Sequence, residues 1–232
     1  MLITDDAGRR LGYVDGRIVN EIPGAQVLPW RMGVNINAPE PRYLVPASSN
    51  ITVTLDGRHL AEPTTTDLFF FAPGFAIGIE QVDLQPGRAD AVNFYPRDEI
   101  LIYQTDSSQS PYLVVALENQ GKAQKADYYF EVQGADMQDG GVIGIGLDSK
   151  SGNLAVLAEA LTGDGTFNFV MNRVTDETDE EFYAEDITLK AGSQVFIDFA
   201  DWQDNKPDGL YFGVDLDGDD QIDEEYTVND AQ

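Results

Sequence analysis

The chain has 232 residues, of which 42% are hydrophobic, so it is long enough for one large domain or two small ones and is not disordered throughout. It has no cysteine, which excludes disulfides, thiolate metal sites and a cysteine nucleophile. Its formal net charge of −27 repels nucleic acid and anionic membranes and favours divalent cations or a basic partner.

The charge is distributed unevenly along the chain. Residues 1–133 carry ten Lys/Arg against 17 Asp/Glu, whereas residues 134–232 carry four against 24, which predicts that the second half is a distinct acidic unit. No apolar run of about 18 residues occurs, so we expect no membrane insertion. Because no signal-peptide pattern follows Met1, we expect the natural chain to extend further upstream.

The opening segment predicts a β-hairpin. Residues 12–19 carry Asp15-Gly16 at their centre, a pair typical of a tight hairpin turn. Pro29–Pro41 is rich in Pro and Asn, lacks periodicity and predicts a long connection. Leu154–Leu161 has a helix-like Ala, Leu and Glu content, but a strand is slightly favoured there.

Strand patterns dominate the rest of the chain. Alternating or β-branched runs recur roughly every 8–12 residues between Gly- and Asp-containing turns, which predicts an all-β sandwich or barrel. These runs are Asn50–Leu55, Asp67–Phe71, Phe75–Val82, Ala91–Tyr95, Glu99–Gln104, Tyr112–Leu117, Tyr128–Val132, Gly141–Leu147, Thr166–Met171, Asp186–Lys190, Gln194–Phe199, Leu210–Leu216 and Glu225–Val228.

An internal repeat suggests two modules. Val82–Gly87 resembles Ile187–Gly192, and an alternating strand follows each. Further pairs follow in the same order: Tyr112–Leu117 with Leu210–Leu216 and Tyr128–Val132 with Tyr226–Val228, while Asn50–Leu55 matches Thr166–Met171 upstream. We interpret these as two tandem β-sandwich modules, Ig-like or jelly-roll-like, covering residues 1–134 and 135–232. The alternative is that β-hairpins with Gly turns resemble one another generically.

One loop predicts a calcium site. Asp215, Asp217, Asp219 and Asp223 place carboxylates at loop positions 1, 3, 5 and 9, and Gln221 offers its backbone carbonyl at position 7. Calcium takes six to eight oxygen ligands, and carboxylates two residues apart on a tight loop can converge on one ion. This loop resembles the aspartate-rich loops of EF-hand, dockerin and thrombospondin type 3 proteins, although its flanks predict strands and not helices.

The loop departs from those families at two positions. Asp220 stands where Gly normally makes the turn, and Tyr226 stands where a bidentate Glu normally sits. We expect Glu224, Glu225 or the Asp201–Asp208 loop to complete the site. The alternative is a solvated acidic turn, because the corresponding first-half loop, Glu118–Lys125, has two lysines and no aspartate array.

Rival functions have weaker signals. A carbohydrate-binding module would use exposed aromatics, with Trp202, Trp30 and Tyr211 as candidates, whereas the phenylalanines around Phe69–Phe71 are expected in the core. A hydrolase would have to use His59, the only histidine, or a chance carboxylate pair, and no catalytic motif is present. A self-assembling surface or filament subunit is a third alternative.

Residues 8–25 resemble a hairpin in β-rich accessory regions of secreted bacterial multidomain proteins. The resemblance implies a secreted or cell-surface location and no catalysis. We therefore expect a non-catalytic, calcium-stabilised extracellular module. Its expected partners are calcium and another domain of the same parent protein or a surface protein or glycan, and not nucleic acid.

Overall fold

The computed structural model describes residues 1–29, 40–118, 126–161, 163–200, 202, 209–219 and 221–231. Every regular element in these ranges is a β-strand, which confirms the all-β prediction. The segment with mixed helix and strand character forms the strand β14 (Asn153–Ala160). Within the same ranges, no helix is long and apolar enough to cross a membrane.

The strands in chain order begin with a short N-terminal group, followed by longer hairpins. The first twelve are β1 (Leu2–Asp5), β2 (Arg10–Val14), β3 (Arg17–Asn20), β4 (Gln26–Leu28), β5 (Arg42–Leu44), β6 (Ile51–Asp56), β7 (Thr64–Ala72), β8 (Phe75–Leu84), β9 (Ala89–Tyr95), β10 (Ile100–Gln104), β11 (Tyr112–Leu117) and β12 (Asp127–Gln133). The others are β13 (Val142–Asp148), β14, β15 (Gly165–Val174), β16 (Asp179–Leu189), β17 (Gln194–Asp198), β18 (Leu210–Asp215) and β19 (Glu224–Val228).

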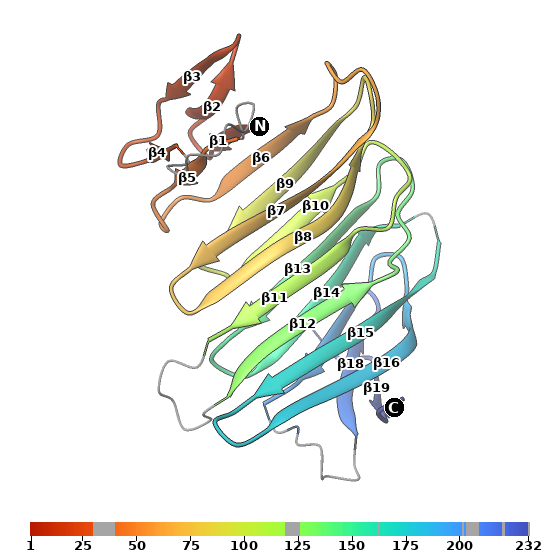
Figure 1. Ribbon diagram of the computed structural model, residues 1–232. Coiled ribbons are helices and arrows are strands. Elements are labelled where there is room, and N and C mark those ends of the chain that lie inside the picture. Colours follow the sequence, from red (N-terminus) through yellow and green to blue (C-terminus); the bar gives the residue numbers. More distant parts are fainter. Residues whose placement is uncertain are drawn as a thin grey trace.

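These strands form two large antiparallel sheets and one small one. In the described residues, eleven strands follow the order β19-β18-β17-β14-β13-β10-β9-β6-β1-β2-β3, six follow β16-β15-β12-β11-β8-β7, and β4 pairs with β5. From β7 onward, successive hairpins alternate between the two large sheets. The chain therefore adds hairpins to the two sheets alternately, from the N-terminal group at one end to the C-terminus at the other (Figure 1).

The core lies between the two large sheets. Period-two alternation buries one face of the central strands, as in β9, where Val92 and Phe94 face inward. Aromatic rings from the two sheets meet in the C-terminal half, where the Phe130 and Phe199 ring centroids lie 4.8 Å apart. This packing of two apolar faces makes the fold β-sandwich-like.

The N-terminal hairpin forms where the sequence predicts it. Val14 and Arg17 are paired at its end, and Asp15 and Gly16 have positive φ angles of 49° and 75°, as a tight primed turn requires. Through β1, which pairs with β6, this hairpin extends the eleven-stranded sheet.

Both large sheets continue across the predicted module boundary at residue 134. The strand β12 pairs with β15, and β10 pairs with β13, so strands on the two sides of the boundary are direct neighbours. The segments near the boundary are also bonded to each other, because Gln109 and Met137 exchange backbone hydrogen bonds of 3.0 and 2.9 Å. Among the matched repeat segments, β8 and β16 lie in the same sheet, whereas β11 and β18 lie in different sheets. The division into two modules remains a prediction.

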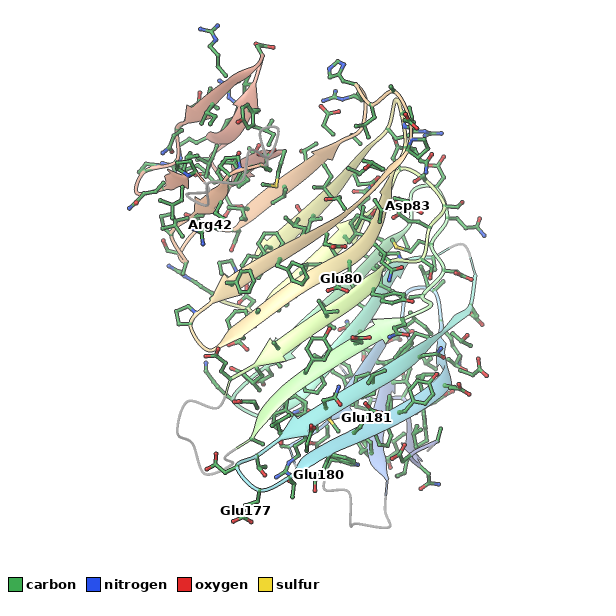
Figure 2. The ribbon with its side chains drawn as sticks, in the orientation of Figure 1. Arg42, Glu80, Asp83, Glu177, Glu180 and Glu181 are labelled. Carbon is green, nitrogen blue, oxygen red and sulfur yellow. The ribbon has the colours of Figure 1, made fainter. Side chains whose placement is uncertain are left out.

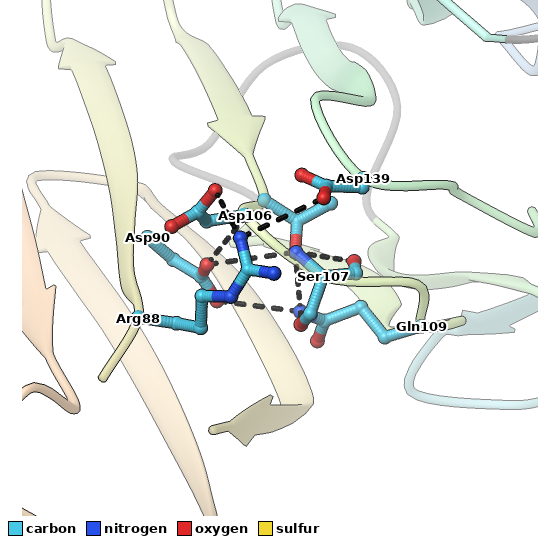
Figure 3. A network of polar contacts seen from close by, with 7 residues as sticks. Arg88, Asp90, Asp106, Ser107, Gln109 and Asp139 are labelled. Carbon is cyan, nitrogen blue, oxygen red and sulfur yellow. Dashed lines mark hydrogen bonds and ion pairs between the residues drawn. The ribbon is translucent and has the colours of Figure 1, made fainter. Parts of the chain in front are cut away.

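A buried carboxylate secures the loop that follows β10 (Figure 3). Asp90 is 3% exposed and accepts hydrogen bonds from the Tyr103 hydroxyl at 2.6 Å, the Asp106 backbone N–H at 2.8 Å and the Gln109 side-chain amide at 3.3 Å. Arg88 pairs with the Asp106 carboxylate at 3.1 Å. Burial and the contact with Asp90 raise the pKa of Tyr103, so its hydroxyl keeps its proton and remains a donor.

Candidate metal site

The candidate site lies in the loop between β18 and β19, at the C-terminal end of the eleven-stranded sheet. The strand β18 is held in place by Leu210, Phe212 and Val214, which alternate into the core. Val214 pairs with Glu224 across the hairpin, and the Asp223 N–H donates to the Val214 carbonyl at 2.8 Å. This register places Asp223 beside the end of β18, where Asp215 begins the loop.

Three of the predicted ligands converge. Asp215, Asp217 and Asp223 each offer one carboxylate oxygen, and these three oxygens lie within 4.8 Å of one another. Asp215 is completely buried, while the other two are exposed. The three residues offer oxygen atoms only, the donor type that calcium prefers. The arrangement could therefore hold a metal ion.

Backbone groups orient this cluster. One Asp215 oxygen accepts hydrogen bonds from the Gly218 N–H at 2.7 Å and the Asp217 N–H at 3.2 Å, while Asp223 accepts one from the Leu216 N–H at 2.8 Å. Gly218 has a positive φ of 75°, which lets the loop turn tightly enough to form these contacts. The N–H groups offset part of the negative charge. Like charges at this spacing still repel, and more strongly where water is excluded.

The other two predicted ligands contact each other, and Asp219 lies outside the cluster. Asp219 accepts hydrogen bonds from Gln221, at 2.9 Å from its backbone N–H and at 2.7 Å from its side-chain amide. Asp220, at the position where related loops have Gly, lies outside the described residues.

The residues expected to complete the site have other contacts. Glu224 forms an ion pair with Lys190 at 3.5 Å, and Glu225 accepts a hydrogen bond from the Tyr211 hydroxyl at 2.9 Å. Tyr226 stacks on Phe212 with ring centroids 5.8 Å apart. The Asp201–Asp208 loop lies outside the described residues, apart from Trp202. In Glu118–Lys125, the first-half loop that corresponds to the candidate site, the residues from 119 onward also lie outside the described residues.

Beside the cluster, Ile222 lies across β18. A Cβ atom added to Gly213 would come within 3.0 Å of the Ile222 side chain, so glycine leaves the space that Ile222 occupies. Ile222 nevertheless remains 45% exposed. It thus contacts the sheet surface without entering the core.

The sequence candidates for the rival functions are scattered. Trp202 is 6% exposed and packs edge-on against Phe182 with ring centroids 5.8 Å apart, so it cannot stack on a ligand. Tyr211 is 40% exposed, and Trp30 lies outside the described residues. His59 is exposed at a turn in which Arg58 forms an ion pair with Asp56 at 2.7 Å.

Sequence reasoning was wrong about two of the phenylalanines. Phe70 and Phe75 are buried as expected, but Phe69 is 42% exposed and Phe71 is 81% exposed. Successive residues of a strand point to opposite faces, so three consecutive phenylalanines cannot all enter one core. The period-two rule applied within Asp67–Phe71 would have placed Phe69 and Phe71 on one face of the strand and Phe70 on the other.

For the whole chain, no protein-family model, curated protein or solved structure matches.

Proposed function

We propose that this chain is a non-catalytic extracellular accessory or surface module whose C-terminal hairpin binds one calcium ion for stability. The observation that carries the proposal is the convergence of Asp215, Asp217 and Asp223 on one another. A purely solvated acidic turn would gain by spreading its charges, whereas a divalent cation among them converts repulsion into attraction.

In this proposal, calcium acts on the acidic second half, residues 135–232. Asp215 and Asp223 lie at opposite ends of the loop, so one ion bound by both would close the β18–β19 hairpin at the edge of the sheet. An ion that binds only the folded hairpin stabilises it by mass action. Asp219 and the Gln221 carbonyl complete the ligand set when the loop adjusts. The partner is another domain of the parent protein, or a surface protein or glycan.

A melting curve with calcium against chelator tests the proposal. Calcium at about one hundred times its dissociation constant adds about 2.7 kcal/mol to the free energy of unfolding. For a chain of this size, that corresponds to a rise in Tm of about 5–10 °C. Magnesium should give a smaller rise because it releases its waters reluctantly and demands octahedral geometry. Equal Tm values in calcium and in chelator would leave only the architecture standing.

The matched control removes a carboxylate elsewhere. Glu62→Gln changes the net charge by the same amount as an Asp→Asn substitution in the β18–β19 loop. Glu62 lies in an exposed bend that is far from this loop in the sequence. We expect this variant to keep the full calcium-dependent shift. If it loses the shift, calcium acts through the overall negative charge and not through the hairpin.

A further inference from the structure

Three strands of the six-stranded sheet, β7, β8 and β12, carry aromatic rings and carboxylates on their outer surface, and β11 lies between β8 and β12. We call this surface the acidic aromatic face. It is formed by Asp67, Phe69, Phe71, Glu80, Tyr129 and Glu131. In Figure 2, Glu80 stands on the broad surface of this sheet, away from the eleven-stranded sheet.

The two phenylalanine rings of this face are highly exposed. Phe71 has 81% of its surface exposed, and its ring centroid lies 6.2 Å from that of Phe69. The Phe69 ring lies on Gly78, where an added Cβ would come within 2.5 Å of it. Val114, in the same row, is buried but is not part of the core cluster between the sheets, so outer side chains cover it. Grouped exposed apolar side chains of this kind mark interaction surfaces.

Strand register places small residues between the rings. Phe71 pairs with Ala76, Ala76 with Ala116, and Ala116 with Tyr129. These residues form one row across four strands, and the two rings stand three strand spacings apart, about 14 Å. The alanines leave a low strip between the rings that an extended segment can lie along.

The charge of this face has one sign only. The strands β7, β8, β11 and β12 contain five carboxylates and no Lys, Arg or His. Partial burial, and then the neighbouring carboxylates Asp67 and Glu131, raise the pKa of Glu80. A second copy of the same face would be repelled, so charge complementarity points to a cationic partner.

We propose that the acidic aromatic face docks an arginine-bearing segment of a partner protein. A guanidinium is the group that both elements of the face suit, because it stacks on aromatic rings and pairs with carboxylates through two parallel N–H donors. A lysine ammonium is more strongly hydrated and lacks the planar stacking surface. The inference is independent of the calcium hairpin, which belongs to the other large sheet.

Binding of a synthetic peptide of alternating Gly and Arg tests the proposal, with a Gly-Lys peptide of equal length as comparison. Affinity is measured by fluorescence anisotropy at about 0.15 M salt, where long-range attraction to the acidic chain is largely screened. Calcium is present at the same concentration in every measurement. The state of the hairpin site is therefore the same for both peptides and does not affect their comparison. We expect the Gly-Arg peptide to bind more tightly than the Gly-Lys peptide.

Two variants and one control locate the binding. Phe71→Ala and the double variant Glu80→Gln with Glu131→Gln should each weaken Gly-Arg binding by about tenfold, as loss of a central contact does. Phe71 is so exposed that its replacement leaves the core intact. Tyr211→Ala, which removes a 40%-exposed ring from the other large sheet, should leave binding within about twofold.

Several results would overturn the proposal. One is an equal loss in the Phe71→Ala and Tyr211→Ala variants, since that indicates general attraction to negative charge. Another is equal affinity for the Gly-Lys peptide. A third is binding of neutral hexasaccharides that depends on Phe71, which would make the face a glycan site. A last one is a dimer in size-exclusion chromatography that Phe71→Ala dissociates, which would make it a self-association surface.

Discussion

Two of the buried aspartates, Asp90 and Asp215, have surroundings of opposite kinds. Asp90 is surrounded by neutral donors that come from other parts of the chain, including the Tyr103 hydroxyl and the Gln109 side-chain amide. Asp215 accepts hydrogen bonds from N–H groups of its own loop, and the loop also brings the carboxylates of Asp217 and Asp223 to it.

The difference between Asp90 and Asp215 shows that burial of a carboxylate does not by itself identify a metal site. A buried carboxylate is stable without a metal when donors satisfy its lone pairs, as they do for Asp90. A buried carboxylate that has other carboxylates as neighbours keeps an electrostatic cost that a cation offsets. The same substitution, Asp to Asn, should therefore have opposite consequences in the two regions.

The largest effect is expected at the hydrogen-bonded aspartate. Asp90→Asn places an amide NH₂ against groups that are themselves donors, so at least one buried donor loses its acceptor. Because Asp90 accepts from three such donors, we expect a loss of about 3 kcal/mol in the free energy of unfolding, equal with calcium and with chelator. Urea denaturation measures it, and Asp139→Asn, which removes only an exposed carboxylate 3.6 Å from Arg88, should cost less than about 0.5 kcal/mol.

A smaller effect, dependent on calcium, is expected in the hairpin. Asp215→Asn keeps an oxygen for the loop N–H groups but removes a charge, so in chelator it should match or slightly exceed the stability of the unmodified chain. With calcium at about one hundred times its dissociation constant, the variant should lose most of a rise in Tm that corresponds to about 2.7 kcal/mol. Asp219→Asn should lower that rise less, because Asp219 lies outside the converging group. A larger loss for Asp219→Asn would show that the ion sits elsewhere in the loop.

The smallest effect concerns a partly buried carboxylate, Glu80, that lies near the carboxylates of Asp67 and Glu131. Partial burial and the charges of Asp67 and Glu131 raise the pKa of Glu80 above its usual value of 4.5, so its ionised form weakens the fold. Glu80→Gln should therefore stabilise the chain by a few tenths of a kcal/mol at pH 7, because partly exposed charges are screened.

The pH dependence checks the sign of this last prediction. The stabilisation by Glu80→Gln should be complete above the raised folded-state pKa and should vanish below the unfolded-state value near pH 4.5, where Glu80 is protonated in both states. Urea midpoints at several pH values measure it. A stabilisation that persists at acid pH would mean that packing, and not charge, is responsible.

Local patterns in the sequence were sufficient for the N-terminal hairpin and for most strands from β6 onward, but they did not reveal β1, β4 or β5. Period-two alternation, as in Val92 and Phe94, depends only on the direction of successive side chains, and Asp15-Gly16 meets the backbone requirement of its turn without help from other residues. The aspartates at alternate loop positions likewise signalled an oxygen-rich site from their spacing alone.

The tertiary structure decided what depends on distant pairing. The sheet to which each hairpin belongs follows from long-range strand contacts, so segments as alike as β11 and β18 lie in different sheets. The β18–β19 register brings Asp223 to Asp215, while Glu224 and Glu225 are engaged by Lys190 and Tyr211. Hydrophobicity predicts burial on average, but only the orientation of β7 in its sheet decides which rings meet the core and which remain on the outer face.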